Sequence, residues 1–144
     1  MKKILIADDD ESIQMLFVDE LTEDGYDVIT TGDGIRLIEM IETEKPDLVI
    51  MDVRLGNYNG LDLLQDIRNT HNNLPVILCT AYPAFKYDLK SIAADYYAIK
   101  SSDLSELKSI IIITLEGGRS LPSSVYKKKV QRSESMRMGR TKVN

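Results

Sequence analysis

Short apolar runs rich in β-branched residues alternate with longer segments of helical spacing along the first 116 residues. The apolar runs are Lys2–Ala7, Asp27–Thr31, Asp47–Met51, Val76–Cys79 and Tyr96–Ile99. A stretch such as Leu48–Met51, apolar at every position, is typical of a strand that is buried on both faces. Five strands alternating with five helices predict an α/β fold, a doubly wound five-stranded parallel sheet with helices on both faces.

The predicted helices are marked by apolar spacing and by residues that start or stop a helix. They cover Ile13–Leu21, Ile35–Glu44, Leu61–Ile67, Ala84–Ala93 and a last segment from Ser102 or Asp103 to Glu116. Gly25 stops the first helix, Asp33 is a candidate N-cap of the second, and Pro46 ends the second.

Charge divides the chain into two parts. Residues 117–144 carry eight Lys or Arg and one Glu, a net charge of +7, which leaves 10 basic and 22 acidic residues and a net charge of −12 in 1–116. The tail has no apolar periodicity, so we expect a folded domain over 1–116 and a basic, disordered tail or linker over 117–144. A basic tail could bind nucleic acid, an acidic protein surface or anionic lipid, but we do not expect nucleic acid to bind the folded domain itself.

No apolar run approaches the roughly 20 residues that a membrane helix needs. The single cysteine, Cys79, excludes an internal disulfide framework. We therefore expect a cytoplasmic protein with no membrane partner.

Polar residues directly follow four of the apolar runs. In a doubly wound sheet, ligands bind outside the carboxyl ends of the strands, so these residues are the candidate site. They are Asp8, Asp9 and Asp10 after the first run, Asp52 after the third, Thr80 after the fourth and Lys100 after the fifth. The pattern predicts acids, a hydroxyl and an ammonium at one edge of the sheet.

Clustered carboxylates need a proton or a cation between them. Two carboxylates about 4 Å apart repel by roughly 4 kcal/mol at an effective dielectric of 20. A few carboxylate oxygens with open positions suit Mg²⁺, which also accepts phosphate oxygens. We therefore interpret Asp52 as a nucleophile for a phosphoryl group, with Thr80 and Lys100 contacting that group.

The sequence resembles the receiver domain of two-component response regulators (CheY-like) over residues 1–116. The matching segments, in the family's order and nearly its spacing, are Ile4–Asp10, Pro46–Asp52, Gly60–Leu64, Pro75–Ala81 and Ala94–Lys100. The resemblance implies a flavodoxin-like (βα)5 fold with strand order 2-1-3-4-5. It also implies a phosphorylation-dependent signalling switch in a phosphorelay, which is not an enzyme although it promotes its own phosphotransfer and dephosphorylation.

The resemblance further implies roles for particular residues. Asp52 would receive the phosphoryl group from a histidine kinase or phosphotransfer protein. Asp9 and Asp52 would bind Mg²⁺, or Mn²⁺, together with the backbone carbonyl of Arg54, and Asp8 would act mainly through water. Thr80 and Lys100 would contact the phosphoryl group.

Tyr97 stands at the position of the family's switch aromatic residue. Two other positions and the length of one stretch depart from the family pattern. Ser101 replaces a proline that follows a cis peptide bond, so this bond could be trans here. Gly56 replaces the proline after Asp52, and the stretch from Thr80 to Lys100 is about two residues shorter, which should trim the fourth helix.

The last predicted helix has four consecutive isoleucines, from Ile110 to Ile113. If Leu107 and Ile111 face the sheet, Ile113 points almost directly away at 100° per residue. This spacing predicts an exposed apolar patch. With the resemblance, it favours a downstream protein or a second copy of the chain as the partner of the fourth-helix and fifth-helix face.

Two other functions stay open. One is a receiver-like scaffold that acts without phosphorylation. The other is a phosphatase with an aspartyl nucleophile, using Asp8 and Asp10 as its motif, although Ser12 is displaced from the Thr of such phosphatases and no cap domain is present. The sequence does not identify the kinase, the downstream target, the phosphate lifetime or the origin of the tail.

Overall fold

The computed structural model describes residues 1–81, 94–101 and 103–116. Its main sheet has five strands, which are β1 (Lys3–Ala7), β2 (Asp27–Thr31), β3 (Leu48–Met51), β6 (Val76–Thr80) and β7 (Tyr96–Ile99). They lie in the order β2-β1-β3-β6-β7, and every neighbouring pair is parallel. Numbered among these five alone, the order is 2-1-3-4-5, which confirms the predicted fold class.

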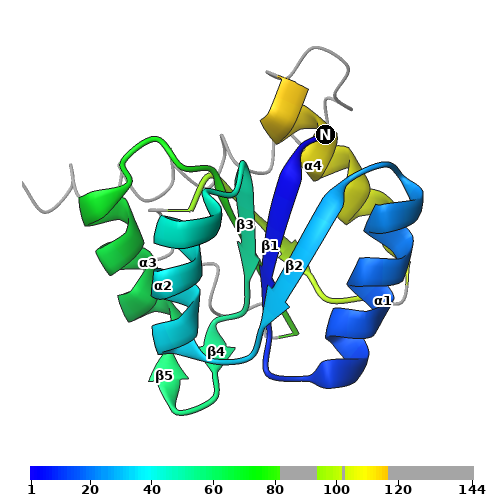
Figure 1. Ribbon diagram of the computed structural model, residues 1–144. Coiled ribbons are helices and arrows are strands. Elements are labelled where there is room, and N and C mark those ends of the chain that lie inside the picture. Colours follow the sequence, from blue (N-terminus) through cyan, green and yellow to red (C-terminus); the bar gives the residue numbers. More distant parts are fainter. Residues whose placement is uncertain (82–93, 102, 117–144) are drawn as a thin grey trace, which may run out of the picture.

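Helices cover both faces of the sheet. Helices α1 (Glu11–Glu23) and α4 (Ser105–Glu116) lie on one face, and α2 (Gly34–Glu44) and α3 (Gly60–Thr70) lie on the other (Figure 1). The predicted helix Ala84–Ala93 and the predicted tail 117–144 fall outside the described residues. No helix among the described residues is long and apolar enough to cross a membrane.

The continuous apolar runs are explained by two separate cores. Successive side chains of a strand point to opposite faces of the sheet. Ile4 and Ile6 of β1 therefore pack in one cluster with residues of α1 and α4, and Leu5 packs in the other with residues of α2 and α3. Burial on both faces is why β1 and β3 contain no alternating polar positions.

Local side chains define where the helices begin. Asp10 accepts a hydrogen bond from the backbone N–H of Ser12, and Asp33 accepts one from that of Arg36, as the predicted N-cap should. At the end of α2, Lys45 adopts a left-handed conformation with φ 49° immediately before Pro46. The predicted helix ends are thus confirmed at both ends of α2.

A small antiparallel hairpin between β3 and α3 was not predicted. It consists of β4 (Arg54–Leu55) and β5 (Tyr58–Asn59), joined by Gly56 and Asn57. Gly56 has φ +61°, whereas Asn57 is not among the residues with positive φ. A positive φ at only the first of two loop residues is the pattern of a type II′ turn, which favours glycine there. Gly56, where the family pattern has proline, is therefore the residue that this turn requires.

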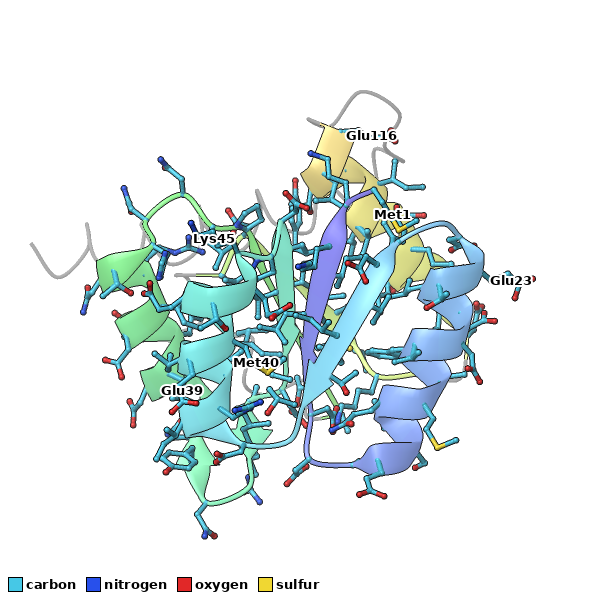
Figure 2. The ribbon with its side chains drawn as sticks, viewed as in Figure 1. Met1, Glu23, Glu39, Met40, Lys45 and Glu116 are labelled. Atoms are coloured by element: carbon cyan, nitrogen blue, oxygen red, sulfur yellow. The ribbon has the colours of Figure 1, made fainter. Side chains whose placement is uncertain are left out.

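The side chains of the described residues fill the layers between sheet and helices, as Figure 2 shows. In this view Glu23 and Lys45, at the ends of α1 and α2, lie at the end of the molecule opposite the β4–β5 hairpin (Figures 1 and 2). The hairpin lies at the carboxyl ends of the strands, the edge where the sequence predicts the site.

The predicted isoleucine patch on α4 is wrong. Ile110, Ile111 and Ile113 are all buried in the same core cluster, and Ile113 is only 2% exposed. Of the four isoleucines, only Ile112 is exposed, at 37%. The prediction assumed that only the side of the helix that faces the sheet is buried. Other neighbouring elements can bury its remaining sides. The peptide bond between Lys100 and Ser101 is trans, as expected for a non-proline residue.

Candidate phosphoacceptor and metal site

The backbone of the sheet fixes the residues that follow its strands. The N–H of Asp8 donates to the carbonyl of Thr31 at 3.0 Å, and the N–H of Asp52 donates to that of Ala7 at 3.1 Å. The N–H of Lys100 donates to the carbonyl of Thr80 at 2.8 Å. These bonds continue the parallel pairing past the strand ends, so Asp8, Asp52 and Lys100 emerge at one edge in a fixed order.

Lys100 brings two of the acids together. Its Nζ atom lies 2.6 Å from Oδ2 of Asp52 and 2.7 Å from Oδ2 of Asp8. The side chains of Asp8 and Asp52 are 4% and 9% exposed, and that of Lys100 is 16% exposed. One ammonium thus balances two carboxylates that are largely withdrawn from water, which leaves the group with a net negative charge.

The surroundings shift the pKa values of this group. Burial raises the pKa of Asp8 above its ordinary value, although the hydrogen bond from Lys100 acts in the opposite direction. Burial alone would lower the pKa of Lys100, but its hydrogen bonds to Asp52 and Asp8 outweigh this effect and raise the pKa. Lys100 is therefore a fixed positive charge at any physiological pH.

The two carboxylate oxygens of Asp52 differ in their hydrogen bonding to the described residues. Its Oδ1 atom is buried and has no hydrogen-bond partner there. A buried carboxylate oxygen without a partner is costly, so this atom indicates a missing ligand. Carboxylate oxygens of Asp8, Asp9 and Asp52 also lie within 4.8 Å of one another. Hard oxygen donors in this arrangement fit Mg²⁺, which binds through one or two carboxylates and keeps several waters.

Asp9 is exposed, unlike the other two acids. Its Oδ2 atom accepts a hydrogen bond of 3.1 Å from the backbone N–H of Gly56, at the tip of the β4–β5 hairpin. The carbonyl of Asp8 accepts one of 2.5 Å from Nε2 of Gln14, on α1. Both bonds come from residues to which the sequence analysis gave no role in the site.

Gly60 allows the chain to pass close behind Asp52. Its N–H donates to the carbonyl of Val53 at 2.6 Å. A Cβ atom at this position would clash with the backbone oxygen of Asp52 and would lie 2.6 Å from that of Val53. Gly60 belongs to one of the segments that resemble the receiver family, but its contact with the backbone of Asp52 could not be predicted from sequence spacing.

The structure brings most of the predicted residues to the same edge. Thr80 is buried at the end of β6, and Arg54 lies in β4, two residues after Asp52. Tyr97 is in β7, and its side chain lies outside the described part of the structure. The roles predicted for Thr80, Tyr97 and the carbonyl of Arg54 stay predictions.

The chain matches a known family model and many known proteins. The model described as "Response regulator receiver domain" matches residues 4–112. A relative from Bacillus subtilis, the alkaline phosphatase synthesis transcriptional regulatory protein PhoP, is 42% identical over 80 residues, which are 56% of this chain and 33% of PhoP. Sporulation initiation phosphotransferase F of the same organism is 27% identical over 112 residues, which are 76% of this chain and 90% of that protein.

Solved structures show the same similarity. The response regulator TrrA from Thermotoga maritima, in complex with Mg²⁺ and BeF, superposes with a TM-score of 0.78 at 36% identity over 80% of this chain and 100% of its own. The structure of histidine kinase ThkA in complex with TrrA gives a TM-score of 0.76 at 36% identity, over 80% of this chain and 99% of the matched chain.

Several of these relatives are longer proteins. The chain spans 33% of PhoP and 46% of the response regulator MprA from Mycobacterium ulcerans. The similarity therefore covers the domain that these proteins share and not the rest of each protein.

Proposed function

Because the chain belongs to the response regulator receiver domain family, we propose that Asp52 accepts a phosphoryl group from a histidine kinase or a phosphotransfer protein. The observation that carries this proposal is the state of the Asp52 carboxylate. Its Oδ2 atom contacts Lys100, and its buried Oδ1 atom has no hydrogen-bond partner among the described residues. A nucleophile needs such an available oxygen beside a group that can neutralise the incoming charge.

The proposed transfer is a single displacement at phosphorus. An oxygen of Asp52 forms the new bond to phosphorus, while the bond from phosphorus to the donor nitrogen breaks and the imidazole leaves with the electron pair. Lys100 holds a positive charge beside the phosphoryl oxygens, and the Thr80 hydroxyl donates a hydrogen bond to one of them. These groups act mainly by position and charge, as phosphoryl transfer requires.

Asp8, Asp9 and Asp52 would hold Mg²⁺, with Mn²⁺ as a substitute, and the carbonyl of Arg54 would complete the protein ligands. When bound, the ion supplies positive charge that neutralises the phosphoryl oxygens. The close approach of the three carboxylates supports this assignment. Crystals of the similar protein TrrA contain Mg²⁺ together with BeF.

The proposed output is altered protein binding rather than turnover of a substrate. Phosphorylation adds negative charge at Asp52, and Thr80 and Tyr97 would shift in response. This shift would change the populations of two conformations that the domain already adopts. A downstream protein or a second copy of the chain would read this change on a surface that includes α4; the other part of the predicted face, the predicted helix Ala84–Ala93, lies outside the described residues. The predicted isoleucine patch gives no support to a binding surface on α4, because Ile113 is buried.

The test uses the full chain with Mg²⁺ and beryllofluoride, which mimics a phosphoryl group on aspartate. We expect chemical-shift changes in ¹H–¹⁵N NMR spectra around Asp52, Thr80 and Lys100. The variant Asp52→Asn should abolish them, whereas Asp66→Asn, at an exposed position of α3, should not.

The same experiment separates the alternatives. No response of the wild type would favour a scaffold that acts without phosphorylation. Repeated turnover of phosphoesters that depends on Asp8 would favour an aspartyl phosphatase.

A further inference from the structure

The β4–β5 hairpin is the largely exposed part of the acidic site. Of its six residues, 54 to 59, only Leu55 is buried. The two strands share only two residue pairs, Arg54 with Asn59 and Leu55 with Tyr58. A two-stranded ribbon of this size is not stable by itself, so its position must depend on contacts with the body of the domain.

Tyr58 provides one contact between the hairpin and the body of the domain. A Cβ atom built on Gly34 would lie only 2.7 Å and 2.8 Å from Cγ and Cδ2 of the Tyr58 ring. The ring therefore rests directly on the backbone of Gly34, the buried first residue of α2, and no other residue type could occupy that position without moving it. Figure 1 shows β5 beside the first turn of α2.

This contact links the loops that surround the acids. Gly32, in the loop before α2, lies against Asp8 and Asp9, because a Cβ built on Gly32 would be 3.5 Å from the Asp8 carbonyl oxygen and from the Asp9 Cα. Gly56, in the hairpin, donates its N–H to the Asp9 carboxylate. The loop before α2 thus contacts the acids, and it leads directly into Gly34, the first residue of α2, on which Tyr58 rests.

We propose that Tyr58 is a positioning residue that, through its contact with Gly34, sets the affinity of the Asp8, Asp9 and Asp52 cluster for a divalent cation. The proposal deepens the proposed function, since it assumes that this cluster binds Mg²⁺. Asp9 is exposed, and the Gly56 N–H is the hydrogen bond that the structure gives to its carboxylate. Holding the hairpin in place therefore holds the Asp9 carboxylate in place before the ion binds, which reduces the ordering cost of binding.

The test measures Mg²⁺ binding to the full chain by isothermal titration calorimetry after removal of metal with EDTA. We expect Tyr58→Ala to weaken Mg²⁺ affinity by about 3- to 10-fold, at or below the lower end of the roughly 10- to 100-fold effect of residues that support metal ligands, because Tyr58 acts through the hairpin. Tyr58→Phe keeps the ring on Gly34 and should stay within about two-fold of the wild type. Ile35→Ala, at a 55% exposed position next to Gly34, is the matched control and should have no effect.

A second variant tests the contact itself. Gly34→Ala inserts a methyl group under the ring, so it should weaken Mg²⁺ affinity when Tyr58 is present. The same methyl group would lie 2.9 Å from Cδ1 of Leu63. In the Tyr58→Ala background the same change should therefore add less than in the wild type, because the contact with the ring is gone and only the contact with Leu63 remains. Such non-additivity is the signature of a direct contact between two sites. Urea unfolding in EDTA shows whether each variant remains folded, and NMR spectra report the Gly56 amide directly.

The outcomes are distinct. Wild-type affinity in Tyr58→Ala, or simple additivity of the two changes, overturns the positioning role and leaves the proposed function intact. Absence of Mg²⁺ binding to the wild-type chain overturns both. Weakened binding in Tyr58→Ala and Gly34→Ala, retained in Tyr58→Phe and non-additive in the double variant, supports the proposal.

Discussion

The ammonium of Lys100 lies 2.6 Å from Oδ2 of Asp52, although the two residues are 48 positions apart in the sequence. The same ammonium contacts Asp8 at 2.7 Å, so one cation stabilises two buried acids. Opposite charges at this distance in a partly buried site interact more strongly than they would in water. Lys100 therefore supports the fold of this edge in addition to its proposed contact with the phosphoryl group.

Replacing Lys100 with Met should destabilise the protein in EDTA at neutral pH. The change leaves two buried carboxylates without their cation, and we expect the free energy of unfolding to fall by about 1–3 kcal/mol. Urea unfolding measures this loss. Lys108→Met is the control, since Lys108 bridges Glu20 and Asp24 at the surface and should matter less. Equal losses in the two variants would contradict the role of Lys100.

The raised pKa of Asp8 predicts a specific pH dependence in EDTA. A folded-state pKa above the unfolded value of 3.8 means that the folded protein binds this proton more tightly. The contribution of Asp8 to stability therefore falls as pH rises from 3.8 to the raised pKa, and is constant above that value.

The variant Asp8→Asn removes this titration. As pH rises from 3.8 to the raised pKa, we expect the wild type to lose unfolding free energy relative to Asp8→Asn. Urea unfolding at a series of pH values measures it. A difference that is independent of pH would show that burial does not raise the pKa of Asp8.

Mg²⁺ should stabilise the wild-type protein through the acidic cluster. At about 100 times its dissociation constant, a ligand that binds only the folded state adds about 2.7 kcal/mol to the free energy of unfolding. Asp9→Asn should remove most of this gain. Because Asp9 is exposed, the same variant should change stability little in EDTA. Thermal unfolding with and without Mg²⁺ measures both effects, and Asp66→Asn should behave like the wild type.

Gly60→Ala should destabilise the protein severely. The added methyl group would clash with the backbone oxygens of Asp52 and Val53, which cannot rotate away, so we expect a loss of about 3 kcal/mol or more. Gly32→Ala is the matched control. Its Cβ would meet neighbours at 3.4–3.5 Å, which is ordinary contact. Similar stability of the two variants by urea unfolding would show that Gly60 tolerates a side chain.

The burial of Ile113 can be tested against its exposed neighbour. Ile113→Ala should cost about 2–4 kcal/mol of unfolding free energy, because it leaves a cavity in the core shared by α4 and the sheet. Ile112→Ala should cost less than about 1 kcal/mol. The reverse order in chemical denaturation would restore the exposed face that the sequence predicted.

The sequence by itself determined the five strands of the main sheet, the four helices that the structure describes and the edge where the candidate site lies. Strands buried on both faces need continuous apolar runs, and the first polar residue after each run must then lie at the carboxyl edge of a parallel sheet. Asp8, Asp52, Thr80 and Lys100 could therefore be predicted from local pattern alone. Asp33 could be predicted as an N-cap for the same reason, since its partner lies three residues away.

Only the tertiary structure decided which loops touch at that edge. The bond from Gly56 to Asp9 spans 47 positions, and the contact of Tyr58 with Gly34 joins a hairpin to a helix that precedes it in the chain. The close passage of Gly60 behind Asp52 and the burial of Ile113 likewise depend on how separate segments pack. Local sequence periodicity shows which positions of one segment are apolar, but it does not specify where a second segment packs against it. These contacts follow from the packing of the whole sheet with its helices.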